Sequence, residues 1–222
     1  MRYSIWVLTE RSVRLTMQSP PQTVKATSAP TRKDRILATS VSSFATYGFR
    51  GVSIGDVAKA CDVSKSTVLH HFETKAGLYK AVLETVNAAL SDIALNDEAT
   101  RASPRERVRD VIARVVSWAK EQDDHACIIV NELIELRSRE QAPPSWSLAP
   151  ALLKLREEIV RGQQAGVVHE EDPYAILEII FAAAIYRSIN RAYRRLSFPS
   201  DAPSEPAMES AVVSLLERAV LR

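Results

Sequence analysis

The chain has 222 residues and a mass of 24.6 kDa, and 46% of its residues are hydrophobic while 25% are charged. This composition is typical of a folded globular protein and excludes wholesale disorder, a collagen-like repeat and a disulfide scaffold. The 29 lysines and arginines nearly balance the 27 aspartates and glutamates, so the net charge of +2 indicates no particular partner. The scarcity of glycine, with six residues in the whole chain, favours helix.

The sequence carries no membrane signal. No stretch reaches the roughly 18 consecutive apolar residues that a transmembrane helix needs, and the apolar run at Ile5–Leu8 is too short for a secretory signal peptide. Cys61 and Cys127 lie far apart and form no paired motif, which is typical of reduced thiols. These features predict a cytoplasmic protein with no membrane partner.

Residues 1–30 lack a sustained hydrophobic period and contain Ser19-Pro20-Pro21 near their middle. We interpret them as a flexible basic tail. Met17 is an alternative start to Met1, and the sequence does not decide between the two.

From Thr31 the pattern changes to that of a helix, because Ile36, Val41 and Phe44 recur with a period of 3.6 residues. Thr31 is a suitable N-cap, and Gly48 stands where a helix C-terminal glycine belongs.

The next 40 residues predict three further helices. Ser53-x-x-Asp56 has the spacing of a capping box, and it opens a short helix that ends at a tight break at residues 61–63. Ser64 then caps a helix that runs to His71. Thr74 begins a fourth helix that reaches about Ile93.

The remainder of the chain is also predicted to be helical. Ser103-Pro104 and Asp172-Pro173 each combine an N-cap residue with a proline at the first helical position. The predicted helices span about 104–121, 124–136, 150–165, 173–196 and 205–221. The fold class is therefore all-α, with about nine helices. Arg187, Arg191, Arg194 and Arg195 are interpreted as the solvated basic end of one helix.

Charge is distributed unevenly along the chain. Residues 1–80 contain 12 basic and five acidic residues, a net charge of +7, whereas residues 81–222 have a net charge of −5. A basic N-terminal part joined to a mildly acidic body indicates a module that binds a polyanion.

Residues 53–72 have the spacing of a helix-turn-helix, in which one helix braces a second that enters the major groove of DNA. The outer face of the second helix presents Lys65, Ser66, Thr67, Leu69, His70 and His71. Lysine and hydroxyl groups can contact bases or phosphates, and leucine can contact the thymine methyl group. Lys75 stands at the start of the next helix, where positive charge favours a phosphate.

Residues 31–80 resemble the N-terminal region of the TetR family of transcriptional regulators. The resemblance rests on Phe44-Ala45-x-x-Gly48-Phe49, Ser53-x-x-Asp56-Val57-Ala58, the run from Val63 to Phe72, and Lys75-x-x-Leu78. It implies a three-helix head at residues 31–80 that binds operator DNA. It also implies a body at 81–222 that binds a small-molecule effector and forms a homodimer through the helices at about 173–196 and 205–221.

Transferred position by position, the resemblance implies that Ser53, Thr67, His71 and Lys75 contact phosphates. Lys65, Ser66 and Leu69 would then face base edges. Three residues depart from the family pattern. Leu69 replaces a tyrosine, Asp62 replaces a turn glycine and tolerates a left-handed conformation, and Gly77 replaces a helix former at a cost of about 1 kcal/mol.

In the body, we expect some apolar and amphipathic residues to line an effector cavity. The candidates are Trp118, Cys127, Trp146, Phe181 and Tyr186. The resulting hypothesis is a ligand-responsive, dimeric regulator of double-stranded DNA with no cofactor, metal or catalytic site. We interpret it as a repressor released from a palindromic operator by its effector, with activation left open.

Two competing hypotheses remain. The first is an all-α enzyme that uses His125 and Glu132 as catalytic groups, although the sequence shows no nucleophile–base pair, cofactor motif or cluster of metal ligands. The second is a helical adaptor that no longer contacts DNA. A salt-dependent footprint on DNA would distinguish all three.

Overall fold

A computed structural model describes residues 29–94, 103–137, 148–197 and 203–222. All regular secondary structure in these ranges is helical, apart from one isolated antiparallel bridge between Val168 and Leu221. The prediction of an all-α protein is therefore confirmed. Residues 31–222 form one compact unit, and the tail predicted for residues 1–30 lies almost wholly outside the described ranges.

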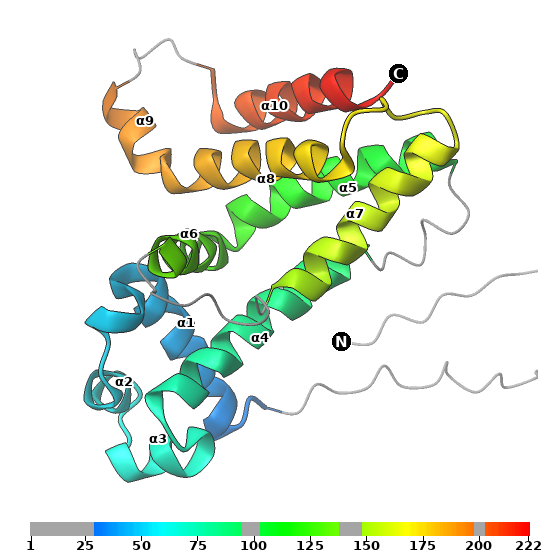
Figure 1. Cartoon of the computed structure of the whole chain (residues 1–222). Helices are drawn as coiled ribbons and strands as arrows, with labels where there is room; N and C mark the ends of the chain where they lie inside the picture. The colour runs from blue at the N-terminus through cyan, green and yellow to red at the C-terminus, as the bar shows by residue number, and fades with distance from the viewer. Residues whose placement is uncertain (1–28, 95–102, 138–147, 198–202) are drawn as a thin grey trace, which may run out of the picture. The chain divides into compact units, whose positions relative to one another are not determined.

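The described helices run in chain order as shown in Figure 1. Their bounds are α1 Arg32–Gly51, α2 Ile54–Ala60, α3 Lys65–Phe72, α4 Lys75–Ala94, α5 Pro104–Glu121, α6 Asp123–Arg137, α7 Ala149–Gln164, α8 Pro173–Ile189, α9 Arg191–Ser197 and α10 Glu205–Val220. None of them has both the length and the apolar character needed to cross a membrane.

The helix predicted over 173–196 is divided at Asn190 into α8 and α9. The side chain of Arg194 stabilises the break, because its Nη1 donates to the carbonyl of Arg187 and to Oδ1 of Asn190, both at 2.7 Å. These bonds satisfy acceptors at the end of α8. No proline or glycine marks the break, so the sequence pattern did not reveal it.

The helix starts predicted from capping residues are confirmed. Thr31, Ser53 and Ser103 each form a complete capping box with the acidic residue three positions later. The glycine signal at Gly166 is confirmed, whereas α1 continues to Gly51, beyond the end predicted at Gly48. Gly48 (φ 66°) interrupts the helical backbone within α1, and Gly166 (φ 71°) follows the end of α7. Both adopt a conformation that glycine reaches without strain.

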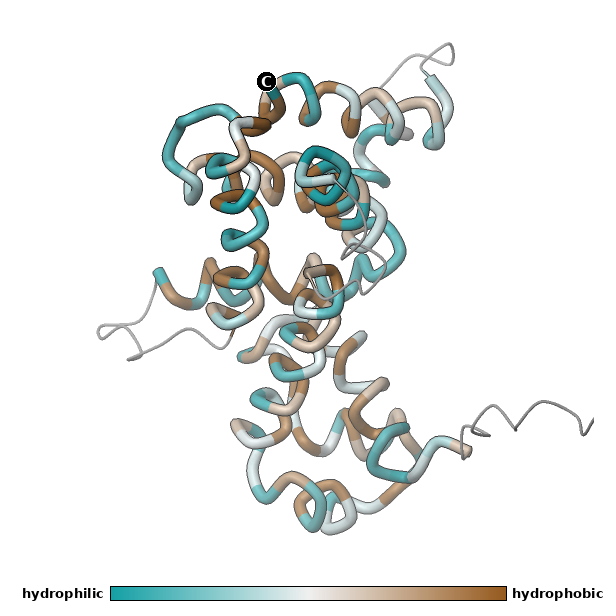
Figure 2. Tube along the Cα trace, turned by 90° about the vertical axis from the view of Figure 1, so that its right-hand side faces the viewer, coloured by the Kyte–Doolittle hydropathy of each residue, from teal (hydrophilic) through white to brown (hydrophobic). Residues whose placement is uncertain are grey.

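The helices α2 and α3 pack against α1 and against each other, and both α1 and α3 also contact α4. The rings of Phe44 and Phe49 both lie 5.0 Å from the ring of Tyr79 on α4, measured between centroids. In Figure 2, hydrophobic and hydrophilic residues alternate within the turns of many helices, as expected of helices that bury one side. The boundary predicted between residues 80 and 81 falls inside α4 and remains a prediction.

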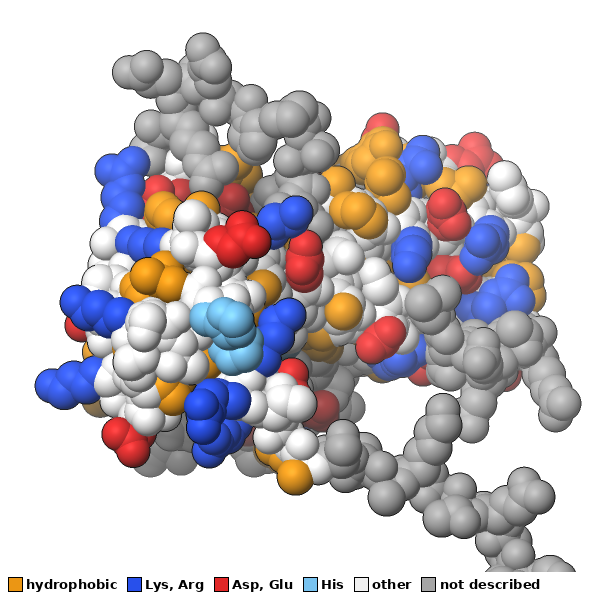
Figure 3. Space-filling model, turned by 90° about the horizontal axis from the view of Figure 1, so that it is seen from below, with side chains coloured by type: hydrophobic (Ala, Val, Ile, Leu, Met, Phe, Trp, Pro, Cys, Tyr) orange, Lys and Arg blue, Asp and Glu red, His pale blue; other side chains and the backbone are white. Residues whose placement is uncertain are grey.

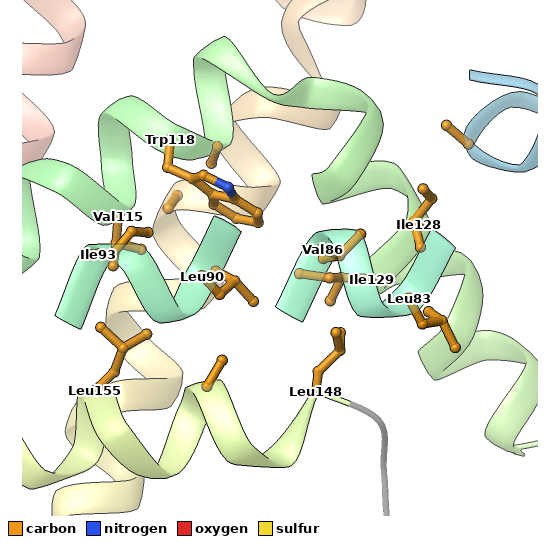
Figure 4. Packing of buried hydrophobic residues seen from close by; sticks show 14 of the residues in the cluster. Leu83, Val86, Leu90, Ile93, Val115, Trp118, Ile128, Ile129, Leu148 and Leu155 are labelled. Atoms are coloured by element: carbon orange, nitrogen blue, oxygen red, sulfur yellow. The ribbon is translucent and has the colours of Figure 1, made fainter. Parts of the chain in front are cut away.

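The second half of α4 lies at the centre of the hydrophobic core. Leu90 is fully buried, and Figure 4 shows it between Trp118 of α5 on one side and, on the other, Leu155 of α7 and Leu148, the residue that precedes α7. α4 therefore runs from the first three helices into the middle of the remaining ones, and it positions one group relative to the other.

Candidate nucleic-acid interface

The candidate interface is built on α2, α3 and the tight connection between them. Asp62 adopts a left-handed conformation (φ 53°) in this connection, as predicted for a residue that replaces glycine. Ser64 then caps α3 by accepting a hydrogen bond from the backbone N–H of Thr67 at 3.1 Å. Val68 and Phe72 point into the core, which turns the opposite side of α3 outward.

The outward side of α3 carries the residues predicted to face base edges. Lys65, Ser66 and Leu69 are exposed, with Leu69 41% accessible. Figure 3 views the molecule from this side, with histidine near the middle and lysine and arginine side chains on several sides of it. The arrangement presents a short, polar and basic helix to solvent, which suits entry into a major groove.

Of the four predicted phosphate contacts, two lie on α3 and two lie at the starts of α2 and α4. Ser53 lies at the start of α2, and its hydroxyl bonds the carboxylate of Asp56 at 2.5 Å. Thr67 and His71 are half-buried on α3. The ammonium of Lys75 lies 4.4 Å from the ring centroid of Phe49, a cation–π contact that holds the charge beside the start of α4. The structure thus places all seven predicted DNA-binding residues on α3 or at the starts of its two neighbours.

The side chain of Lys65 lies across α2, a placement that the sequence did not suggest. A Cβ atom added to Gly55 would stand 2.7 Å from Cε of Lys65. Ser53 lowers the pKa of the Asp56 carboxyl by donating hydrogen bonds to it, and the positive charge of Lys65 lowers that pKa further. The glycine in the first turn of α2 is the only sequence signal for this close approach.

The rings of His70 and His71 on α3 are 5.4 Å apart at their centroids, and their planes are inclined at 62°. Among the described residues, no three His, Cys, Asp or Glu side chains gather as metal ligands. Of the two residues weighed as catalytic groups, Glu132 is buried and accepts a hydrogen bond from the hydroxyl of Tyr79 at 2.7 Å.

In the body, a cavity of about 490 Å³ opens between α4, α5 and the start of α6. Its lining consists of Ala89, Asp92, Ile93, Arg114, Ser117, Trp118, Glu121, Gln122 and His125. A volume of this size is within the range of small-molecule sites. The sequence predicted only Trp118 from this set.

The other predicted effector residues lie elsewhere. Cys127 and Phe181 are half-buried and Tyr186 is 63% exposed, and none of the three belongs to the lining of this cavity. Trp146 lies outside the described residues. His125 belongs to the lining as well, and its ring lies 6.3 Å from that of Trp118, measured between centroids.

Burial perturbs two titratable groups near the cavity. Desolvation lowers the pKa of His125, and the nearby carboxylate of Asp124 opposes that shift. Burial also raises the pKa of the Cys127 thiol. His125 therefore favours its neutral form, which presents both a donor and an acceptor nitrogen.

Polar contacts join α6 to the DNA-facing helices. The hydroxyl of Ser42 on α1 donates to the carboxylate of Asp124 at 2.5 Å. Further along α6, Nδ2 of Asn131 donates to the carbonyls of Phe44 and Ala45 at 3.2 and 2.9 Å. One helix thus contacts the cavity at its first turn and the head along its length.

The chain is similar to known DNA-binding regulators. Residues 36–82 match the model of the tetR family of bacterial regulatory proteins. The HTH-type transcriptional repressor NicS of Pseudomonas putida is 23% identical over 157 residues, which cover 70% of this chain and 74% of NicS. The HTH-type transcriptional regulator RutR of Escherichia coli is 34% identical over 55 residues, covering 25% of this chain and 26% of RutR.

A solved structure extends the likeness to the fold of most of the chain. A regulatory protein of the tetR family from Rhodococcus superposes with a TM-score of 0.64 at 22% identity, covering 85% of this chain and 96% of that one. The matching head, the similar relatives and the shared fold agree with the exposed basic helix found here. Residues 36–82 are thus a DNA-binding domain of the tetR family of bacterial regulatory proteins, within a chain that is similar over most of its length to DNA-binding transcriptional regulators.

Proposed function

We propose that the protein is a ligand-responsive repressor that binds a palindromic operator as a homodimer and is released by a small-molecule effector. The observation that carries this proposal is the position of α6. Its first turn lines the 490 Å³ cavity, and its side chains bond α1 and α4 of the DNA-facing part. A ligand that shifts α6 changes the free energy of both regions together, which is the condition for coupling two sites.

Repression is favoured by the resemblance to NicS, a protein named as a transcriptional repressor. In such an arrangement, the effector binds more tightly to the conformer that fits DNA poorly and so lowers the population of the DNA-binding one. An activator would show the opposite sign of coupling.

A homodimer is favoured by the outward faces of α8 and α10. Large apolar side chains stand exposed there, namely Tyr174, Ile179, Tyr186, Ile189 and Leu215. Exposed apolar surface of this extent is typical of interaction sites. Pairing these helices with their counterparts in a second copy forms a four-helix contact with two-fold symmetry, and two-fold symmetry in the protein matches a palindrome in DNA.

The first experiment is footprinting on the DNA upstream of the protein's own coding region, repeated at several salt concentrations. We expect a protected region with two symmetric halves and an affinity that falls steeply with salt. The absence of any protected DNA at low salt would overturn the proposal. An unsymmetric single footprint would overturn the dimeric part alone.

A matched pair of lysine variants tests the phosphate contacts. We expect Lys75→Ala to weaken binding to all sequences and to reduce the salt slope by about 0.9 per subunit. Lys80→Ala is the control, because this exposed lysine on the same helix pairs only loosely with Glu84, at 3.9 Å. A loss in Lys75→Ala that is confined to one operator sequence contradicts the phosphate role.

Trp118, which lines the cavity, provides a test of whether small molecules bind there. A thermal-shift screen provides stabilising small molecules, and we expect those that occupy the cavity to change tryptophan fluorescence in the wild type but not in Trp118→Phe. Ser117→Trp should obstruct the cavity and impair release from DNA while leaving operator binding intact. Leu153→Trp, at an exposed position on α7, is the control for adding the ring.

A further inference from the structure

A second, much smaller cavity lies where α8, α9 and α10 meet α5. Its volume is about 10 Å³, close to the minimum that a single water-sized particle needs. The polar side chains around it are Lys120, Arg187, Ser188, Arg191, Arg194 and Glu205. The sequence pattern suggested a solvated basic helix end, which is wrong for Arg187 and Arg194, since both are buried.

The charges around this cavity do not cancel. The carboxylate of Glu205 accepts hydrogen bonds from two arginines, from Arg187 at 3.1 Å and from Arg194 at 2.8 and 3.0 Å. The ammonium of Lys120 pairs with Glu209 at 2.8 Å. Arg191 lies 3.7 Å from Asp123. Four cations therefore share three carboxylates, which leaves one positive charge in excess among the described residues.

Two polar atoms of residues that line the cavity have no hydrogen-bond partner within the part of the chain that the structure describes. They are Nη1 of Arg187 and the hydroxyl oxygen of Ser188, both shielded from solvent. The Arg187 side chain is only 7% exposed, so bulk water does not solvate its charge freely. A buried guanidinium N–H and a buried hydroxyl beside excess positive charge are the groups that recognise a small anion.

We propose that this cavity binds one monovalent anion of halide size, chloride under ordinary conditions, held by Nη1 of Arg187 and the hydroxyl of Ser188. The volume is too small for sulfate or phosphate to enter, whereas a single halide matches both the space and the one excess charge. The anion joins α8 to α9 and α10 and stabilises their junction. The site is independent of DNA binding and of the effector cavity, so the proposal stands apart from the proposed function.

The test is thermal unfolding of the full chain in potassium glutamate, titrated with potassium chloride or bromide at constant ionic strength. We expect the midpoint to rise with the logarithm of the halide concentration once the site begins to fill, because the anion binds only the folded state. Crystals soaked in sodium bromide should show an anomalous peak between Arg187 and Ser188. Midpoints that do not differ between chloride and glutamate would overturn the proposal.

Variants separate this site from general salt effects. Ser188→Ala removes one donor and keeps every ion pair, and it should raise the half-saturating chloride concentration roughly tenfold. Ser210→Ala, at an exposed position on α10, should leave it unchanged. Arg187→Lys retains the charge that faces Glu205 but offers no second nitrogen, and it should lose the halide response. An unchanged response in Ser188→Ala, or a side chain from residues 198–202 in the cavity, contradicts the assignment.

Discussion

Two kinds of contact join the DNA-facing helices to the rest of the molecule. Along α6 the connection includes long-range hydrogen bonds, through Ser42, Asn131 and the Tyr79–Glu132 pair, beside buried apolar side chains such as Ile128. Along α4 and α7 it is made by tightly packed apolar side chains such as Leu90 and Leu155 (Figure 4). We call these the polar connection and the apolar connection.

The two connections should respond differently when one helix is displaced relative to another. Hydrogen bonds weaken steeply outside a narrow range of distance and angle, so a small shift breaks them. Apolar cores are packed at crystal-like density and resist deformation. We therefore expect the apolar connection to determine the stability of the whole unit, and the polar connection to determine how firmly the head is held.

The largest effect is expected from breaking the apolar connection with Leu90→Ala. Leu90 is fully buried, so the variant should lose about 2–5 kcal/mol of unfolding free energy through lost transfer energy and a new cavity. Denaturant titration measures the loss. Leu153→Ala on α7, where the leucine is 47% exposed, is the control. Equal losses in both variants would contradict the role assigned to α4.

Tyr79→Phe tests the buried part of the polar connection. The variant removes a 2.7 Å hydrogen bond to the carboxylate of Glu132, which is only 3% exposed. Removing a donor from a buried charged acceptor should cost about 1–3 kcal/mol. Chemical denaturation measures the cost. Tyr47→Phe serves for comparison because Tyr47 is 68% exposed, and a cost as large there would refute the argument from burial.

A pair of asparagine variants compares the two connections directly. Asn131→Ala should cost about 1 kcal/mol and speed amide hydrogen exchange in α1. Asn87 accepts from the backbone N–H of Ala151 on α7 at 3.2 Å, so Asn87→Ala should instead speed exchange at the start of α7. Exchange that rises equally across α1 and α7 in either variant would show that the two connections are not separable.

The smallest effect concerns His125 at the cavity end of α6. Burial lowers its folded pKa below the unfolded value of about 6.5. The unfolded state then binds more protons, so the contribution is fully present above pH 6.5 and is lost as the pH falls below it. We expect His125→Gln to flatten the stability curve just below pH 6.5. The capping carboxylates Asp34 and Asp56 also have lowered pKa values, but their contribution is lost in a more acidic window, below pH 3.8.

Local signals in the sequence predicted the head almost completely. Thr31, Ser53 and Ser64 cap helices through bonds to backbone groups three residues away. Gly48 and Asp62 adopt the left-handed conformations expected of them. Such interactions depend on neighbours in the chain, so residue type and spacing suffice to predict them.

At Gly77, helix propensity alone gives the wrong expectation for the effect of glycine. Helix propensity predicts that glycine costs about 1 kcal/mol at this position. In the folded chain, a Cβ atom there would lie 2.2 Å from the carbonyl oxygen of Phe72. The tight connection between α3 and α4 therefore requires glycine, and the apparent defect is a consequence of close backbone approach.

By itself, the sequence determined that the chain is all-α, where most helices begin and end, and which side of α3 faces outward, because these depend on hydrophobic period and on caps. Only the tertiary structure decided which side chains meet across helices. It placed Trp118 and His125 at one cavity, buried Arg187 and Arg194 beside Glu205, and divided the eighth helix at Asn190. Those contacts join residues distant in the chain, and their free energy exists only once the helices are packed.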